Sequence, residues 1–481
     1  MTELSPSLTS DPLHSRLKDF VITATGLTYY ADRDEDLAQR IGRRLSKLGL
    51  HDCTSYLQVL QDKHSGESEF DALVKELTIG ETYFFRHREQ FDALRDMVLP
   101  DIIQRKRDSR RLRIWSAGCA TGPELYSIAI LLKRDLADLV EGWDVSILGT
   151  DINREFLARA IEGRYDEWAF RDCPEDLKRD CFSRNGKYWE LAAEYKRGVF
   201  FQYHNLVKHP FPSLLHNLSA FDFILCRNVM IYFSREIIPK LVGQFRDCLV
   251  EGGWFLVGHA EPNAEIYQTF RAINAPGSTL YQKIGPQAAE SERVTTVAEC
   301  WLPPNVEPYE LPACPATPLI TNLDFALPQP EDIPAARESN APPLQPEVGE
   351  PELTAVRLLA NQGDVEAAAR SCQLLLETQN LNPLVHFYYA LVQEQMGLHA
   401  ETERSLRRAI YLERNFVLAH YYLAVCLQKK GDRSGAARSF QNVLQLLARM
   451  DASETFAEGD GITVADLNEL AEMNLNVLQG S

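Results

Sequence analysis

Apolar positions recur along the chain with three different spacings. Between residues 13 and 77 they follow a helical period, which predicts an all-helical N-terminal domain over residues 1–90. Across residues 91–285, short apolar runs alternate with helical stretches, a pattern typical of an α/β domain. After residue 351 the helical period returns. The pattern therefore predicts an α/β protein with helical regions on both sides of its sheet domain.

The apolar runs of the α/β region predict buried strands. They lie at residues 112–115, 145–148, 221–226 and 254–258, with a last strand near 280–282. Each run is short and continuous, as expected for strands that helices cover on both faces.

Residues 162–204 interrupt this alternation. The stretches 187–191 and 199–203 are rich in β-branched and aromatic residues, and Asn185-Gly186 is a turn signal. We expect a small β insertion here.

A glycine-containing turn follows the strand at 112–115. Gly118 and Gly122 stand four residues apart, just before a predicted helix. Glycine allows a close backbone approach to a ligand, and the helix start offers unpaired N–H groups. The lysine of a phosphate-binding loop is missing, and a tight turn without a ligand explains this stretch equally well.

An acidic residue, Asp151, ends the second predicted strand. A carboxylate at this place can accept hydrogen bonds from ribose hydroxyls, or it can cap the next helix, a role open to Asn153 as well. The turn and Asp151 together favour an adenosine-containing cofactor. Asn228 and His259 also follow strands, so we expect them in the same crevice as Gly118.

Composition sets the class of protein. With 481 residues, 45% hydrophobic and 25% charged, the chain suits a soluble protein of several domains. A net charge of -18 argues against nucleic-acid binding. We expect no membrane insertion, because no apolar run has the length of a span, and no signal peptide. The ten cysteines include no C-x-x-C pair, so we expect no metal site and a reduced, cytoplasmic protein.

One N-terminal helix has a basic face. Opposite its apolar stripe at Leu37 and Ile41, four cations share one side. A docking surface for an acidic partner and an ordinary solvated surface both fit, and composition alone favours the second. The cations are Arg40, Arg43, Arg44 and Lys47.

A linker and a repeat region come after the α/β domain. Residues 286–350 contain more than half of the 25 prolines, which predicts a flexible linker that keeps the C-terminal region away from the cofactor pocket. Gly363, Gly397 and Gly431 then recur every 34 residues, the tetratricopeptide period. We expect two to three repeats over residues 351–450, with a protein-binding concave surface, and a tail or capping helix over 451–481.

Four further stretches stand out as motifs: ETYFFR at 81–86, SAGCATGPELYS at 116–127, CRNVMIYF at 226–233 and GHAE at 258–261. Together they closely resemble the CheR family of S-adenosylmethionine-dependent methyltransferases. The resemblance covers residues 13–284, and the repeats resemble those of a bacterial branch of the family linked to surface sensing and biofilms. The resemblance over residues 13–284 implies a Rossmann-like methyltransferase domain with an N-terminal helical domain and a small β insertion.

The resemblance also implies a function and a set of site residues. Family members methylate glutamate side chains of chemotaxis-type receptors, so a protein-glutamate O-methyltransferase with a receptor's cytoplasmic domain as substrate is expected. The basic helix then becomes a candidate receptor-docking surface, while the partner of the repeats stays unknown. The alternative is a scaffold whose methyltransferase domain binds the cofactor but is weakly active. The implied catalytic residues are Arg86 and Tyr232, and the implied cofactor-binding residues are Gly80, Thr82, Arg86, Gly118, Glu124, Asp151, Asn205, Leu206, Arg227 and Asn228.

One position departs from the family pattern. Members commonly have Gly-Glu-Glu after the glycine turn, whereas this chain has Gly122-Pro123-Glu124. The second acidic residue is present, so we expect cofactor binding to be retained.

Overall fold

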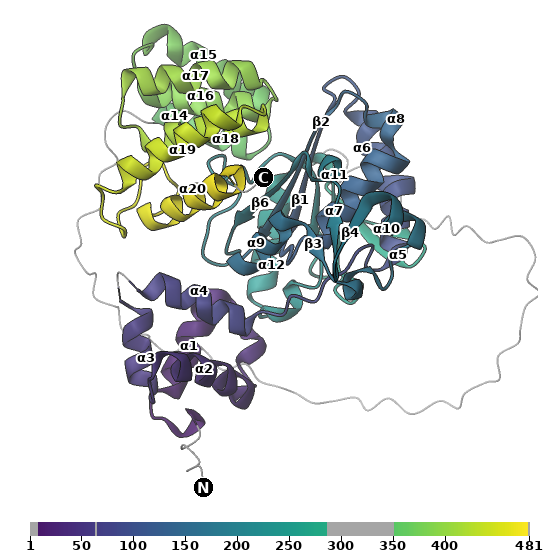
Figure 1. Cartoon of the computed structure of the whole chain (residues 1–481). Coiled ribbons are helices and arrows are strands. Elements are labelled where there is room, and N and C mark those ends of the chain that lie inside the picture. The colour runs from purple at the N-terminus through teal and green to yellow at the C-terminus, as the bar shows by residue number, and fades with distance from the viewer. Residues whose placement is uncertain (1–7, 63–64, 286–350, 480–481) are drawn as a thin grey trace, which may run out of the picture. The chain divides into compact units, whose positions relative to one another are not determined.

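The computed structural model describes residues 8–62, 65–285 and 351–479 (Figure 1). The described residues belong to one compact unit. The linker predicted at 286–350 lies outside the described residues. Among the described residues, no helix has both the length and the apolar character that crossing a bilayer requires.

Four α-helices build the described part of the N-terminal domain. Their apolar stripes meet in one core, in which Leu17, Ile41, Tyr56 and Leu73 are all buried. The helices are α1 (His14–Thr25), α2 (Asp34–Leu48), α3 (Cys53–Leu60) and α4 (Gly66–Leu77).

A seven-stranded sheet forms the centre of the α/β domain. Its order is β6-β2-β1-β7-β8-β10-β9. The first five strands run parallel to one another, β10 pairs with β8 in antiparallel orientation, and β9 pairs with β10 in the same way. The strands are β1 (Arg111–Ala117), β2 (Asp144–Asp151), β6 (Val199–Tyr203), β7 (Phe221–Cys226), β8 (Leu249–Val257), β9 (Arg271–Ala275) and β10 (Ser278–Gln282).

Helices cover both faces of this sheet. Successive strand residues point to opposite sides, and because the strands are continuously apolar, both faces need to be covered. Ile114 packs with Leu125 and Ile128 on one face, whereas Trp115 packs with Phe245 on the other. This arrangement confirms the predicted Rossmann-like class. The helices of the domain are α5 (Arg88–Ala93), α6 (Leu99–Arg105), α7 (Pro123–Ile130), α8 (Ala137–Val140), α9 (Arg154–Glu162), α10 (Glu175–Cys181), α11 (Ala193–Lys196) and α12 (Ile237–Cys248).

The insertion is smaller than the sequence suggests. It is a three-stranded antiparallel sheet of β3 (Arg164–Tyr165), β5 (Tyr188–Leu191) and β4 (Phe182–Asn185). The assignment of residues 199–203 to it is wrong, because these residues form β6, which pairs in parallel with β2. Phe200 and Phe201 pack on opposite faces of the main sheet, and β6 is its half-buried edge strand.

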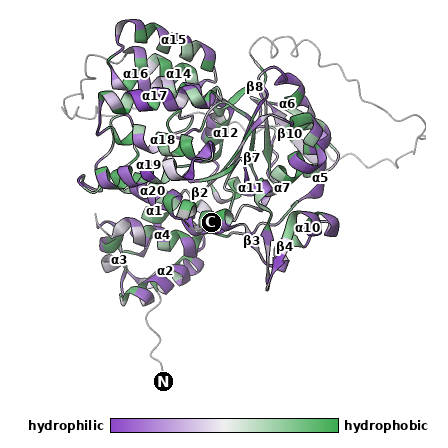
Figure 2. Ribbon diagram, turned by 45° about the horizontal axis from the view of Figure 1, so that its top comes forward, coloured by the Kyte–Doolittle hydropathy of each residue, from purple (hydrophilic) through white to green (hydrophobic). Residues whose placement is uncertain are grey.

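Three helix pairs and a last helix make up the described part of the C-terminal region. Gly363, Gly397 and Gly431 join the two helices of each pair with φ of +86°, +75° and +82°, a left-handed conformation that favours glycine. Hydrophobic and hydrophilic residues mix along these helices, as expected where one face is packed (Figure 2). The elements are α14 (Pro351–Asn361), α15 (Val365–Thr378), α16 (Pro383–Gln395), α17 (His399–Leu412), α18 (Val417–Lys429), α19 (Arg433–Leu447) and α20 (Val464–Gln479).

The repeats pack against the α/β domain. Leu214 and Leu215, which precede β7, belong to the hydrophobic cluster of the repeats. The expectation that only a flexible tether connects the repeats to the enzyme is therefore wrong.

Candidate functional site

A cavity of about 360 Å³ lies at the carboxyl ends of the central strands. Strands β1, β2 and β7 each contribute residues at or just beyond their last positions, and the N-terminal helical domain contributes a further wall. Of the site residues predicted from the sequence, those that line the cavity are Thr82, Arg86, Gly118, Glu124, Asp151, Asn205, Leu206, Arg227, Asn228 and Tyr232.

The glycine turn after β1 forms the floor of this site. Gly118 has φ +75°, and a Cβ there would lie 2.3 Å from a methyl group of Val229, so no larger residue fits. The N–H groups of Gly118 and Cys119 both donate to the Thr150 carbonyl. Pro123 stands at the first turn of α7, where a missing N–H costs nothing. The departure from Gly-Glu-Glu therefore keeps the turn and its helix.

Asp151 is a buried carboxylate at the end of β2. It accepts hydrogen bonds from the N–H groups of Ala120 (2.9 Å) and Asn153 (2.8 Å). Burial raises the pKa of this carboxyl to about 6. Asn153, and not Asp151, caps α9, because its side chain accepts from the first N–H groups of that helix. Asp151 is thus available to a ligand in the cavity.

Glu124 and Arg227 form an ion pair below the cavity. Arg227 Nη1 lies 2.7 Å from Glu124 Oε2, and the Ser116 hydroxyl donates to Glu124 Oε1 at 2.8 Å. Gln90 fixes the guanidinium from the other side: its amide oxygen accepts from Arg227 Nε at 2.7 Å, and its amide nitrogen donates to the Val257 carbonyl. Sequence reasoning missed Gln90, which carries no motif of its own.

Glu261 holds the loop after β7. Its carboxylate accepts from the N–H groups of Asn228 (2.8 Å), Val229 (3.2 Å), Ile231 (3.3 Å) and Gly258. Burial raises the pKa of this carboxyl. Asn228 has φ +59°, and its side-chain oxygen is buried without a hydrogen-bond partner among the described residues. The GHAE motif thus supplies a positioning residue that sequence reasoning did not assign.

His259 and Gly80 do not line the cavity. His259 is exposed, and its ring stacks on that of His87 with the centroids 5.5 Å apart. Gly80 lies against the ring of Phe156, which itself lines the cavity. The expectation that His259 shares the crevice with Gly118 is wrong, because its ring packs on His87, which does not line the cavity either.

Arg86 and Tyr232 lie at the cavity beside the helical domain. Arg86 Nη1 donates to the Glu81 carbonyl at 2.7 Å, while its Nε is buried and has no partner in the described part of the chain. The ring of Tyr232 meets that of Tyr29 at 5.8 Å, and burial raises the pKa of Tyr232. Tyr29 was missed because only the packing of two domains brings it here. Other cavity residues not predicted from the sequence include Thr25, Leu27, Tyr30, Ile152 and Phe156.

Asn205 joins the two domains. Its side-chain nitrogen donates to the Ala24 carbonyl at 2.8 Å, and its side-chain oxygen accepts from the N–H groups of Val207 and Lys208. Protein groups therefore engage both side-chain atoms, and Leu206 next to it gives the cavity an apolar wall.

The basic face of α2 is largely paired. Arg44 makes two hydrogen bonds with the buried Glu69 of α4, at 2.9 and 2.6 Å. Arg43 and Lys47 both contact Glu76, but their side chains stay 53% and 57% exposed. Arg40 binds Asp36 at 2.9 Å and the Glu76 carbonyl. The face thus divides into two half-exposed cations and two that stabilise the packing of α2.

Comparison with known proteins identifies the family. Residues 80–278 match the family described as "CheR methyltransferase, SAM binding domain", and residues 15–78 match "CheR methyltransferase, all-alpha domain". The chain belongs to the CheR family. As a CheR-family member it is an S-adenosylmethionine-dependent methyltransferase.

Several curated relatives share this region or more. The chain is 27% identical to the probable biofilm formation methyltransferase WspC of Pseudomonas aeruginosa, over 89% of this chain and 97% of that protein. It is 31% identical to the chemotaxis protein methyltransferase of Borreliella burgdorferi, over 54% and 90% of the two chains. It is also 31% identical to chemotaxis protein methyltransferase 2 of Vibrio cholerae, over 56% and 91%.

The residues present fit S-adenosylmethionine. Asp151 offers a carboxylate for ribose hydroxyls, and the groups of the described chain that donate to it are backbone N–H groups. The unpartnered side-chain oxygen of Asn228 can accept from an ammonium group. Leu206 and Phe156 provide apolar surface for a purine ring.

Proposed function

We propose that this CheR-family enzyme methylates glutamate side chains in the cytoplasmic domain of a methyl-accepting chemotaxis-type receptor and forms methyl esters. The family and the named activities of its relatives support this substrate class. The observation that carries the proposal is Arg86, a guanidinium at the cavity whose Nε has no partner among the described residues.

The chemistry needs few protein groups. S-adenosylmethionine, when bound, would supply a methyl group on a positively charged sulfur; a nucleophile bonds to the methyl carbon as the carbon–sulfur bond breaks and the neutral thioether leaves. A glutamate carboxylate is already ionised at neutral pH, so the protein has no proton to remove. Placement in line with the methyl group is what remains for the protein to supply, and orientation can contribute about 7–11 kcal/mol.

Arg86 and Tyr232 can supply this placement. The planar guanidinium can hold one carboxylate oxygen and leave the other to attack. The Glu81 carbonyl fixes one end of the guanidinium, so its Nε keeps a defined direction. Tyr232 packs against Tyr29 and can donate its hydroxyl to the same substrate carboxylate. Both side chains act as orienting groups in this proposal.

Receptor docking falls on the exposed part of the basic helix. Arg43 and Lys47 are half-exposed and pair with the same acidic neighbour, Glu76, so they retain a net positive charge for a glutamate-rich receptor helix. Arg40 and Arg44, which were predicted to join them, are engaged in the packing of the domain.

Transfer of a labelled methyl group tests the proposal. The full chain is incubated with methyl-tritiated S-adenosylmethionine and membranes that contain a candidate receptor. We expect label in the receptor that mild alkali releases as methanol, because esters are base-labile. Tight cofactor binding without transfer to any receptor would instead support a scaffold with a weakly active methyltransferase domain.

A further inference from the structure

A short loop of the α/β domain enters the repeat region. This leucine loop comprises residues 211–218, and two backbone hydrogen bonds of 3.1 and 2.9 Å between Ser213 and Leu218 close it. Leu214 and Leu215 stand between them, and each is only 3% exposed. Both belong to the hydrophobic cluster of the repeats and not to the clusters of their own domain.

Side chains of the repeat region bind the leucine loop. From α18, the Tyr422 hydroxyl donates to the Leu215 carbonyl. From α14, Arg357 pairs with Asp460, whose carboxylate accepts from the Ser213 hydroxyl at 2.7 Å. The repeats thus recognise the leucine loop by its side chains and by its backbone.

The contact continues next to the loop. Gln395 of α16 donates its amide to the hydroxyl of Ser219, which is buried. Tyr422 and Gln395 belong to different repeats, and both bind the stretch that leads into β7. Gln395 of α16, Tyr422 of α18 and Asp460, which precedes α20, thus form the receiving face for this stretch.

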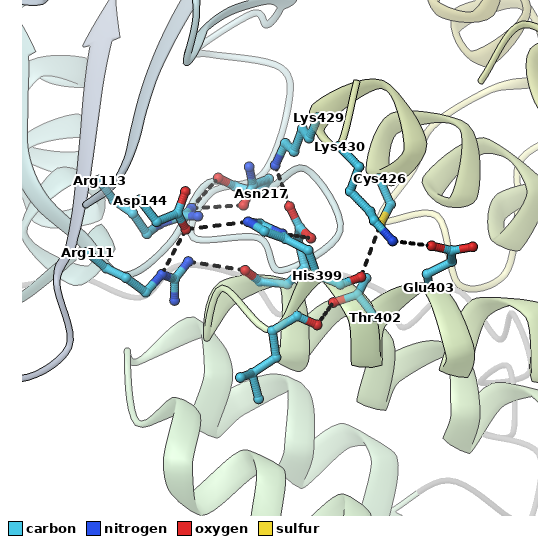
Figure 3. A network of polar contacts seen from close by, with 12 residues as sticks. Arg111, Arg113, Asp144, Asn217, His399, Thr402, Glu403, Cys426, Lys429 and Lys430 are labelled. Atoms are coloured by element: carbon cyan, nitrogen blue, oxygen red, sulfur yellow. Dashed lines mark hydrogen bonds and ion pairs between the residues drawn. The ribbon is translucent and has the colours of Figure 1, made fainter. Parts of the chain in front are cut away.

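A charged network also joins the repeats to β1 and β2 (Figure 3). His399 lies 3.6 Å from Asp144 of β2 and 3.2 Å from Glu394 of α16. Arg111 contacts Asp144 at 3.2 Å and the Glu394 carbonyl at 3.1 Å, and Lys429 pairs with Glu394. Opposite charges alternate across the interface, so the charged network stabilises the same docked arrangement as the leucines.

We propose that the receiving face is a binding surface for a tight loop that presents two adjacent leucines after a serine, and that the leucine loop occupies it in competition with a partner protein that carries such a loop. The chain's own loop shows the chemistry that this face accepts: two apolar side chains, a hydroxyl for Asp460 and a backbone carbonyl for Tyr422. Because the occupant belongs to the same chain, it competes at a high effective concentration, and an outside loop binds weakly until the leucine loop is released.

Peptide binding to the full chain tests this competition. The probe is a fluorescein-labelled peptide of residues 208–221, titrated by anisotropy. We expect the variant Leu214→Asp with Leu215→Asp to bind the peptide at least about tenfold more tightly than the wild type, because its own loop no longer fills the receiving face. Leu139→Asp, at an exposed position of the same domain, serves as the matched control and should leave the wild-type affinity unchanged.

Two further arms keep the test decisive. The variant Leu214→Asp with Leu215→Asp is called the opened chain. Adding Tyr422→Ala to it should remove its gain in peptide affinity, and a peptide with both leucines replaced by aspartate should not bind. Retained S-adenosylmethionine binding shows that the opened chain is folded, and if it does not fold, Leu215→Ala should give a smaller gain in the same direction. Equal peptide affinity for the wild type and a folded opened chain, or no binding to either, overturns the proposal.

Discussion

Two aspartates at the opposite ends of strand β2 have opposite electrostatic surroundings. Asp144, at the beginning, contacts Arg111 and His399, and these partners hold the pKa of its carboxyl below the usual range. Asp151, at the end, accepts from backbone N–H groups, and burial raises its pKa to about 6. The first end of the strand is neutralised by protein cations and holds the repeats. At the second end, the Asp151 carboxylate has no cationic partner among the described residues. It can therefore accept hydrogen bonds from the hydroxyl groups of a bound ligand.

The largest expected effect is at the cavity end, on turnover. Arg86→Ala should lower the rate of methyl transfer by about 100-fold or more, since misplacement of a reacting group costs about that much. Its effect on the dissociation constant of S-adenosylmethionine should be much smaller. Arg86→Lys should rescue poorly, because lysine keeps the charge without the planar fork. Near wild-type turnover in the lysine variant would show that a simple cation suffices.

Asp151→Ala should weaken cofactor binding by about 1–3 kcal/mol, the cost of losing hydrogen bonds to a charged group. Asp144→Ala is the matched control on the same strand and should leave the calorimetric dissociation constant within about twofold of wild type, since this residue faces the repeats. If both substitutions weakened cofactor binding equally, the contrast between the two ends of β2 would be lost.

The two ends should also respond to pH in opposite directions. Affinity for S-adenosylmethionine should fall as pH drops through about 6, by up to about tenfold per pH unit, because protonation removes the negative charge that makes Asp151 a strong acceptor. His399 has its pKa raised to about 9 by Asp144 and Glu394, which Arg111 and Lys429 also contact. A raised histidine pKa stabilises the docked repeats below about 6.5, its ordinary value, and this contribution is lost as pH rises through about 9.

Binding of the labelled peptide measures the effect of His399 at alkaline pH. Wild-type affinity for the peptide should rise between about pH 7 and 9.5, as the charged network weakens and the leucine loop is released more easily. His399→Gln removes the titrating group and should flatten this rise. A pH dependence of the same size in His399→Gln would assign it to another group.

The smallest expected effect is on receptor docking. Arg43→Gln with Lys47→Gln should raise the Michaelis constant for receptor by about two- to tenfold, the range that exposed charge pairs support, and leave cofactor affinity unchanged. Arg16→Gln, an exposed cation on α1, is the matched control. Activity that does not change with added salt in the wild type would argue against electrostatic docking, since salt screens exposed charges.

The sequence predicted the elements whose signal is local. The apolar run at residues 221–226 forms β7 with the same bounds. A strand that is covered on both faces appears in the sequence as a continuous apolar run, so it can be predicted from its own residues alone. The 34-residue period likewise predicted the helix pairs, since each repeat places its glycine at the same turn. The strand at 199–203 was assigned to the wrong sheet, because its composition suits either sheet and only pairing with β2 decides.

Features that depend on distant contacts left no such signal. Tyr29 reaches the cavity through the packing of two domains, and Gln90 acts through Arg227. The pairing of Arg44 with Glu69 joins two helices whose charges look solvated when each is considered alone. Docking of the repeats depends on Leu214, which reads as part of an ordinary surface loop in the sequence.

The most direct test of the central claim is to locate the transferred methyl group by mass spectrometry. The full chain and its Arg86→Ala variant are each incubated with S-adenosylmethionine and a receptor cytoplasmic domain, and the receptor is then digested at mildly acidic pH to preserve esters. The account predicts methyl groups on glutamate side chains with the wild type and almost none with the variant. Methyl groups on lysine or arginine nitrogens, or equal glutamate methylation by both chains, would contradict it.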